Sequence, residues 1–120
     1  MSLLIVAALP AAGGCTKFTN AGGGTAAVSI RLVAYHPEGL RVPAGTSVTW
    51  TQRDPGFHTV TSGTAVVDAT GAAAMHPDGV FDSGNLATGG RFSFTFPSPG
   101  TYRYFCRVHP ATMHGSITVS

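Results

Sequence analysis

Residues 104–115, with the sequence YFCRVHPATMHG, gather a thiol, two imidazoles and a thioether within nine positions. These side chains belong to Cys106, His109, Met113 and His114. Thiolate sulfur and imidazole nitrogen are the donors that zinc and copper prefer, and a thioether adds a soft, weaker donor. The rest of the chain is poor in reactive side chains, so this stretch predicts a metal site.

A further imidazole lies far upstream, at His58 in the segment PGFHTVT, where a strand is expected to start. A β-sandwich can bring a strand start and the loop between its last two strands to the same end. We therefore expect one site built from His58, Cys106, His109 and Met113. Two imidazoles and a thiolate with a weak axial thioether define the type 1 copper site. Zinc is the chemical competitor, but a methionine as fourth ligand favours copper.

The remaining histidines and the carboxylates give weaker signals. His114 is an alternative ligand to Met113, although an exposed loop position is the simpler interpretation. His76 follows Met75 in AAAMHPD, and this pair is a candidate for a secondary copper-loading spot. His36, in YHPEG, is expected in a turn. The carboxylates all lie in predicted turns and indicate no acid–base pair: Glu38, Asp54, Asp68, Asp78 and Asp82.

The elements that must position the site are predicted to be short strands. From Val28 onward, apolar and polar residues alternate with a period of two. The alternating apolar positions are Val28, Ile30 and Leu32; Val48 and Trp50; Phe92, Phe94 and Phe96; Ile117 and Val119. Turn signals such as HPEG, RDPG and PSPG separate these runs, and no segment shows a convincing amphipathic helix. This pattern predicts an all-β protein, an antiparallel sandwich or barrel. Residues 62–78 are expected to form a long connection with one short strand or helical turn.

Size and charge exclude several classes of protein. A chain of 120 residues, 43% of them hydrophobic, indicates one domain with a real core. The net charge of +2, without a basic cluster, argues against nucleic-acid binding. We expect a monomer.

The N-terminal residues predict export. Residues 1–15, MSLLIVAALPAAGGC, are interpreted as a secretory signal with a lipobox-like end at Cys15, although no Lys or Arg precedes the apolar run. That run is too short to span a bilayer as a folded helix. Lipidated Cys15 would attach the protein to the membrane at an extracytoplasmic location, either periplasmic or on the outer face. The alternative is an N-terminal strand or disordered tag with an idle cysteine. Residues 16–27 predict a flexible Gly-rich tether, and residues 28–120 the folded domain.

The same residues resemble a known family. Residues 28–120 are similar to the cupredoxins, specifically plastocyanin-like and halocyanin-like proteins, in the segments AGTSVTW, HTVTS and FDSGNLATGGRFSFTFPSPGTYRYFCRVHPATMHGSITV. The resemblance covers nearly the whole predicted domain and includes the four ligand positions in order. It implies a Greek-key β-sandwich and one type 1 copper ion. It also implies one-electron transfer with redox protein donors and acceptors that bind transiently.

Two positions depart from the family pattern. Many relatives have two residues between the last histidine and methionine ligands, whereas three residues separate His109 from Met113. Thr59 stands where plastocyanin carries an asparagine that braces the cysteine loop, so the bracing must differ here.

The resemblance also implies how electrons enter. In cupredoxins the C-terminal histidine ligand, here His109, shows its ring edge to solvent within an apolar patch. Residues 55–57 and 110–111 are the small or apolar neighbours expected to build that patch. Arg53 and Arg107 are expected to add a basic rim that favours acidic partners.

Three functions from different classes fit these features. They are an electron carrier, a protein for copper storage, delivery or resistance, and a copper enzyme such as a nitrite reductase or oxidase. The enzymes need further copper sites and usually several domains, so we expect no enzyme. Copper-traffic proteins favour open Met/His clusters, whereas a single cysteine between two histidines makes a closed redox site. The sequence therefore favours electron transfer.

Overall fold

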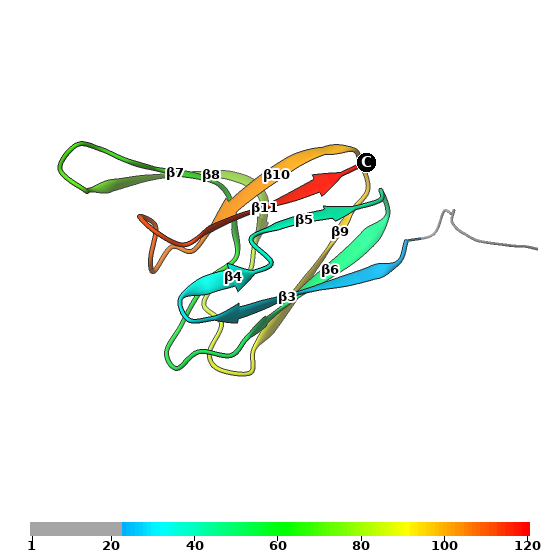
Figure 1. Cartoon of the computed structure of the whole chain (residues 1–120), viewed down its shortest axis with the longest axis horizontal. Helices are drawn as coiled ribbons and strands as arrows, with labels where there is room; N and C mark the ends of the chain where they lie inside the picture. The colour runs from blue at the N-terminus through cyan, green and yellow to red at the C-terminus, as the bar shows by residue number, and fades with distance from the viewer. Residues whose placement is uncertain (1–22) are drawn as a thin grey trace, which may run out of the picture.

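The computed structural model describes residues 23–120 (Figure 1). The predicted signal, residues 1–15, and residues 16–22 of the predicted tether lie outside this range. Within residues 23–120 the regular structure consists of strands in two sheets, which confirms the all-β sandwich. None of the described residues form a helix long and apolar enough to cross a membrane.

The first sheet has four strands in the order β4-β3-β6-β9. Their bounds are β3 Thr25–Arg31, β4 Ala34–His36, β6 Thr46–Gln52 and β9 Arg91–Phe96. β3 runs parallel to β6, and the other two pairs are antiparallel. β3 begins inside the predicted tether, because residues 25–27 pair with residues 47–49 of β6. The sheet therefore starts at Thr25 rather than at Val28.

The second sheet has five strands in the order β5-β11-β10-β7-β8. Their bounds are β5 Gly39–Val42, β7 Thr61–Val67, β8 Ala73–Asp82, β10 Gly100–Phe105 and β11 His114–Val119. The expectation of a long connection over residues 62–78 was wrong, because this segment forms most of the β7–β8 hairpin. Most of β8 and the outer half of β7 are exposed, so neither carries the alternation that marks a half-buried strand. The hairpin projects from the left-hand end of the sandwich in Figure 1.

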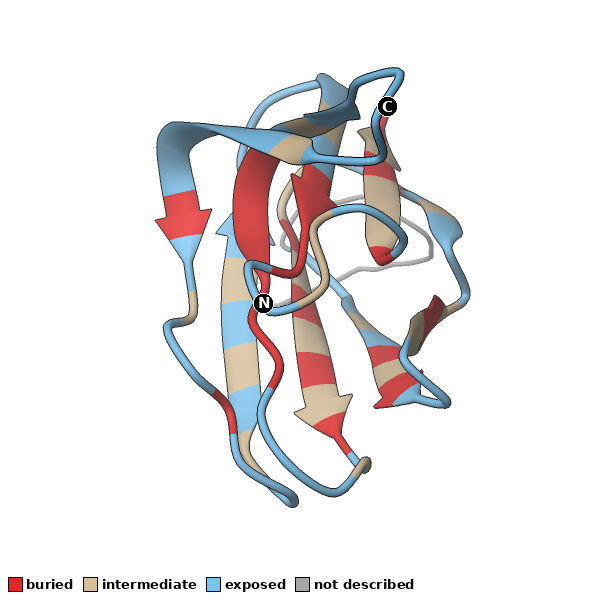
Figure 2. Cartoon of the chain, turned by 90° about the vertical axis from the view of Figure 1, so that its left-hand side faces the viewer, coloured by how far each residue is buried: buried red, intermediate tan, exposed pale blue. Residues whose placement is uncertain are grey.

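The core between the sheets is centred on Trp50, which is fully buried. Its ring lies 5.4–6.4 Å, between centroids, from the rings of Phe81, Phe92, Phe96 and Tyr104. Buried positions alternate with more exposed ones along the strands, as Figure 2 shows. Each large apolar side chain that is fully buried contributes about 1.5–3 kcal/mol. The core therefore gives the loops at the sandwich ends a rigid support.

The turn between β3 and β4 breaks the predicted alternation. It consists of two residues, Leu32 and Val33, with φ of 56° and 54°. Positive φ at both positions suits Asn-Gly and is unfavourable for Leu and especially for a β-branched residue. Leu32, which the alternation had placed in the first strand, is instead 76% exposed at the turn.

Candidate metal centre

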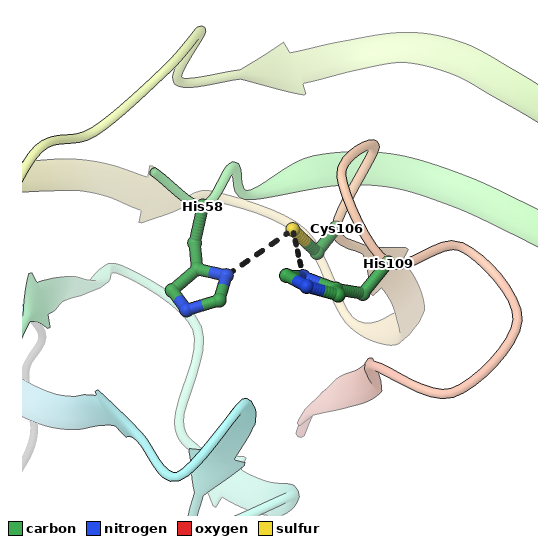
Figure 3. A group of neighbouring side chains, drawn as sticks. All are labelled: His58, Cys106 and His109. Atoms are coloured by element: carbon green, nitrogen blue, oxygen red, sulfur yellow. Dashed lines mark hydrogen bonds between the residues drawn. The ribbon is translucent and has the colours of Figure 1, made fainter. Parts of the chain in front are cut away.

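His58, Cys106 and His109 come together at one end of the sandwich, with their side chains turned toward one another (Figure 3). Cys106 Sγ lies 3.7 Å from His58 Nδ1 and 4.0 Å from His109 Nδ1. Donors that share one ion at bond lengths of about 2.0–2.3 Å and angles of roughly 110–120° lie about 3.3–4.0 Å apart. The three side chains therefore fit a single ion. Within residues 23–120, no other group of His, Cys and carboxylate side chains is close enough to hold one.

The loop after β10 carries two of these side chains and is closed by its own backbone. The His109 amide donates to the Cys106 carbonyl at 3.3 Å, and the Met113 amide donates to the His109 carbonyl at 3.0 Å. The Cys106 amide then donates to the Met113 carbonyl at 3.0 Å. This compact turn accommodates the three residues between His109 and Met113. The Met113 side chain is buried, and its role as the fourth ligand stays a prediction.

His58 is held from both its backbone and its ring. Its amide and carbonyl form a two-way bridge with Leu86, at 3.1 and 2.7 Å. Its Nε2 lies 2.9 Å from Asp54 Oδ2, while Nδ1 faces the Cys106 sulfur. A neutral imidazole has one donor and one acceptor nitrogen. Donation from Nε2 to the carboxylate therefore leaves the Nδ1 lone pair for a metal ion.

Asp54 is the functional residue that the sequence analysis missed, because it was interpreted only as a turn residue. Its carboxylate also accepts the amides of Leu32 and Val33, at 2.7 and 2.8 Å. Burial raises the pKa of the Asp54 carboxyl, but the hydrogen bonds from these amides and from His58 outweigh it and hold the pKa below its ordinary value. One signal was available: a carboxylate four residues before the predicted histidine ligand.

Gln52 fixes the loop that carries Asp54. The Gln52 side chain is fully buried, and its Nε2 donates to the carbonyls of Asp54 at 3.0 Å and Gly56 at 3.1 Å. Its Oε1 accepts the Asp54 amide at 2.6 Å. A buried side chain that is satisfied at both ends holds the loop in one conformation.

Thr59 stands at the position where the family pattern has an asparagine, and it braces the cysteine loop in its own way. Its Oγ1 accepts the Arg107 amide at 2.9 Å, which ties the cysteine loop to the segment after His58. Its own amide donates to Cys106 Sγ at 3.3 Å. This hydrogen bond fixes the position of the sulfur that would bind the ion. Thr59 therefore holds both the Cys106 sulfur and the backbone that follows it.

The other histidines do not join the cluster. His114 Nε2 lies 2.7 Å from the Pro110 carbonyl oxygen. His76 and Met75 are exposed on β8, and among residues 23–120 His76 belongs to no group of three or more His, Cys and carboxylate side chains close enough to hold an ion; the secondary loading spot stays a prediction. His36 ends strand β4 rather than lying in a turn, and its Nε2 lies 2.9 Å from the Arg31 carbonyl oxygen.

The surface beside His109 is a shallow apolar pocket. It is lined by residues 54–58, Val33, Val108 and His109. Phe57 and Val108 are 55% and 47% exposed. Of the residues expected here from the sequence, 55–57 line the pocket and 110–111 do not, whereas Val33 and Val108 were missed. Val33 lies 76 residues before His109 in the sequence, and only the fold brings it to the pocket.

The predicted basic rim is weaker than expected, because Arg107 forms an ion pair with Asp82. Their Nη2 and Oδ2 atoms lie 2.7 Å apart. Burial raises the pKa of the Asp82 carboxyl, but the Gly84 amide and the Arg107 guanidinium outweigh it and hold the pKa below its ordinary value. Arg53 is exposed and forms no ion pair among residues 23–120.

Comparisons with known proteins agree with this site. The copper binding proteins of the plastocyanin/azurin family match residues 23–120. Amicyanin-alpha from Methylorubrum extorquens is 31% identical over 112 residues, which cover 91% of this chain and 83% of amicyanin-alpha. A purple cupredoxin from Nitrosopumilus maritimus is 34% identical with a TM-score of 0.62, covering 79% of this chain and 99% of the cupredoxin. A Cu(I) amicyanin variant is 30% identical with a TM-score of 0.61, covering 81% of this chain and 83% of the variant.

Proposed function

The chain belongs to the plastocyanin/azurin family of copper-binding proteins, and from this premise we propose that it carries single electrons between redox proteins. The observation that carries the proposal is the enclosed group of one thiol and two imidazoles held by separate braces. The proposed ligands are His58, Cys106 and His109, with Met113 as the weak axial ligand. Such a donor set suits both Cu(I) and Cu(II).

Bound copper would supply a one-electron change between Cu(I) and Cu(II). The chain's own contribution is to keep the donor atoms in one arrangement through that change. Asp54 fixes the ring of His58, Thr59 braces the loop after Cys106, and backbone hydrogen bonds close the loop around His109. Donors fixed in this way need little rearrangement between the two oxidation states. An electron carrier requires this small rearrangement, whereas a copper-storage protein does not require it.

His109 is the proposed point where electrons enter and leave. It is half-buried beside the apolar pocket, whereas His58 and Cys106 are buried. An apolar patch can bind a redox partner briefly without strong charge pairing, so the partner is released after the transfer. Arg53 lines a different hollow, with Thr51 and Arg91, so a preference for acidic partners through its charge stays a prediction.

Electron self-exchange between two copies of the protein tests this function without a known partner. NMR line broadening in mixtures of the Cu(I) and Cu(II) forms measures its rate. We expect fast exchange that slows at least severalfold when a charge is added to the exposed part of the His109 loop by Ala111→Glu. Ala74→Glu, the same change at an exposed position on the β7–β8 hairpin, is the matched control and should slow exchange less. The visible absorption spectrum should stay nearly the same in both.

One result would contradict the proposed entry point, and another would contradict the carrier function. Equal rates for wild type and Ala111→Glu would mean that electrons enter by another surface. Slow exchange in the wild type, together with ready transfer of Cu(I) to a chelator, would favour copper storage or delivery instead.

The proposed location is extracytoplasmic, through a lipid on Cys15. This residue lies outside the described part of the chain, so the proposal rests on the signal-like sequence alone. In a bacterial host that makes the precursor with a complete signal, the wild type should take up a radiolabelled fatty acid and fractionate with membranes. Cys15→Ala should abolish the label. A wild type without label would rule the lipid anchor out.

A further inference from the structure

We propose that Asp54 is a positioning residue with two roles: it sets the state of the His58 ring and holds the apolar Leu32–Val33 turn beside the site. The inference rests on the proposed copper site for its first role only. Three donors from two distant segments meet at this one carboxylate: the amides of Leu32 and Val33 and the ring of His58. No Arg or Lys among residues 23–120 forms an ion pair with it.

The first role follows from the two ring nitrogens of His58. Nε2 is within 2.9 Å of the Asp54 carboxylate, and Nδ1 is on the side of Cys106. The carboxylate therefore selects the tautomer with its proton on Nε2 and keeps the ring from turning. Its negative charge also lies one ring away from the ion that Nδ1 faces. A negative charge at that distance favours the more positive, oxidised form and lowers the reduction potential.

The second role follows from the strained backbone of the turn. Leu32 and Val33 adopt left-handed conformations, which carry a steric cost for such residues because Cβ comes too close to the following carbonyl oxygen. The sequence contains neither Asn nor Gly there to relieve this cost. The two amides donate to Oδ1 and Oδ2 of Asp54 at 2.7 and 2.8 Å, and hydrogen bonds to a charged acceptor offset it. The result is two exposed apolar side chains, of which Val33 lines the pocket next to His109.

Asparagine cannot replace this carboxylate. Oδ1 serves Leu32, while Oδ2 serves both Val33 and His58. Asn offers one acceptor oxygen and an amide group that only donates, so at least one of the three donors loses its partner. The side chains of Gln52 and Thr88 donate to the Asp54 carbonyl, and the Asp54 amide donates to Gln52 Oε1, so these bonds to the Asp54 backbone keep the loop in place when the side chain changes. The side chain can therefore be tested without displacing its loop.

The central variant is Asp54→Asn, measured against wild type. In the copper-free protein, the amides of Leu32 and Val33 should exchange with solvent roughly tenfold faster, because a charge-assisted hydrogen bond is lost. In the Cu(I) protein, the Nε2 proton signal of His58 should broaden or disappear. The reduction potential should rise. Asp68→Asn, which removes a carboxylate at the distant hairpin tip, is the matched control and should leave the potential unchanged.

A second variant separates positioning from simple stability. The pair L32N and V33G installs the Asn-Gly sequence that a turn with two positive φ values prefers. Asp54→Asn should also lower the free energy of unfolding. When L32N and V33G are added to it, most of that loss should be recovered, while the reduction potential stays raised and the His58 Nε2 proton signal stays weak. If the potential returned with the stability, Asp54 would be structural only. An unchanged potential in Asp54→Asn would overturn the first role, and unchanged amide exchange would overturn the second.

The experiments can tell a failure of the Asp54 proposal apart from a failure of the proposed electron-carrier function. A wild type that binds no copper would sink the electron-carrier proposal and the first role. Amide exchange in the copper-free protein would then still decide whether Asp54 holds the turn.

Discussion

The Leu32–Val33 turn and the tip of the β7–β8 hairpin each depend on an aspartate, but the two aspartates work over different distances. Asp68 accepts hydrogen bonds from Thr70 and Ala72, all within four residues of itself. Asp54 accepts amides that lie 21 and 22 residues before it, together with the ring of His58. A local clamp stabilises only its own turn, whereas a long-range clamp makes a turn depend on the site beside it.

Packing differs between the same two regions. At the metal end, a Cβ added to Gly115 would overlap the ring of Tyr104. At the hairpin tip, a Cβ added to Gly71 would meet open space, and glycine is favoured there only by the φ of +88°. The metal end is therefore constrained by neighbours from several strands, and the hairpin tip by its own backbone.

The largest effect is expected from Gly115→Ala. The new methyl group must displace the buried Tyr104 ring, so we expect a loss of about 3 kcal/mol in the free energy of unfolding, at the upper end for overpacking. Gly71→Ala should cost only about 1–2 kcal/mol, from its positive φ. Urea denaturation of the copper-free proteins measures both. Equal losses would mean that the two regions are not packed differently.

Thr59→Val should have the next largest effect. It leaves the Arg107 amide without its acceptor inside the cysteine loop, at a cost of about 1–3 kcal/mol. The loop should also release copper faster. Thr70→Val makes the same change at the exposed hairpin tip and should stay within about 0.5 kcal/mol of wild type. Copper dissociation rates and urea denaturation provide the measurements, and a copper loss rate unchanged by Thr59→Val would argue against the bracing.

Met113 should tune the site more than it holds it. If Met113 is the axial ligand, Met113→Leu should keep copper and raise the reduction potential. Met113→Gln should lower it, since an amide oxygen stabilises Cu(II) better. Met75→Leu, on the exposed hairpin, is the control and should change nothing. Voltammetry decides the matter: if neither Met113 variant moves the potential, His114 becomes the next candidate.

The smallest effect is expected when low pH protonates Asp68 at the hairpin tip. Hydrogen bonds from the Thr70 hydroxyl and from the Thr70 and Ala72 amides hold the pKa of Asp68 below its ordinary value. A lowered pKa means that the ionised form stabilises the tip at neutral pH. That contribution is lost only as the pH falls below about 4, the ordinary value for aspartate, and through the folded pKa. The amide chemical shifts of Thr70 and Ala72 should report this transition, and Asp68→Asn should abolish it.

The strand pattern predicted most of the fold because half-buried strands reveal themselves by alternation. Trp50, Ile117 and Val119 lie in the core as the pattern indicates. The β7–β8 hairpin was missed because strands exposed on most of their length carry no such pattern. Leu32 was misplaced because the alternation runs past the end of β3 into a turn that contains neither Asn nor Gly.

The metal ligands were predictable because the residue types that bind copper can be recognised one residue at a time. The grouping of His58, Cys106 and His109 follows from residue type and from the ends of strands. The partners that hold them were not predictable in the same way. Asp54 and Thr59 act through contacts with segments 21 to 48 residues away, and their residue types are ordinary in turns and strands. The apolar pocket likewise needs Val33, which only the fold brings near His109.

The visible absorption spectrum of the protein loaded with one equivalent of Cu(II) decides whether the site binds type 1 copper. A thiolate bound to Cu(II) gives intense charge-transfer absorption, which a hydroxyl cannot produce. We expect that the wild type shows this absorption and that Cys106→Ser loses it together with most of its copper affinity. A wild type without intense visible absorption, or a Cys106→Ser variant that keeps it, would contradict the type 1 copper site.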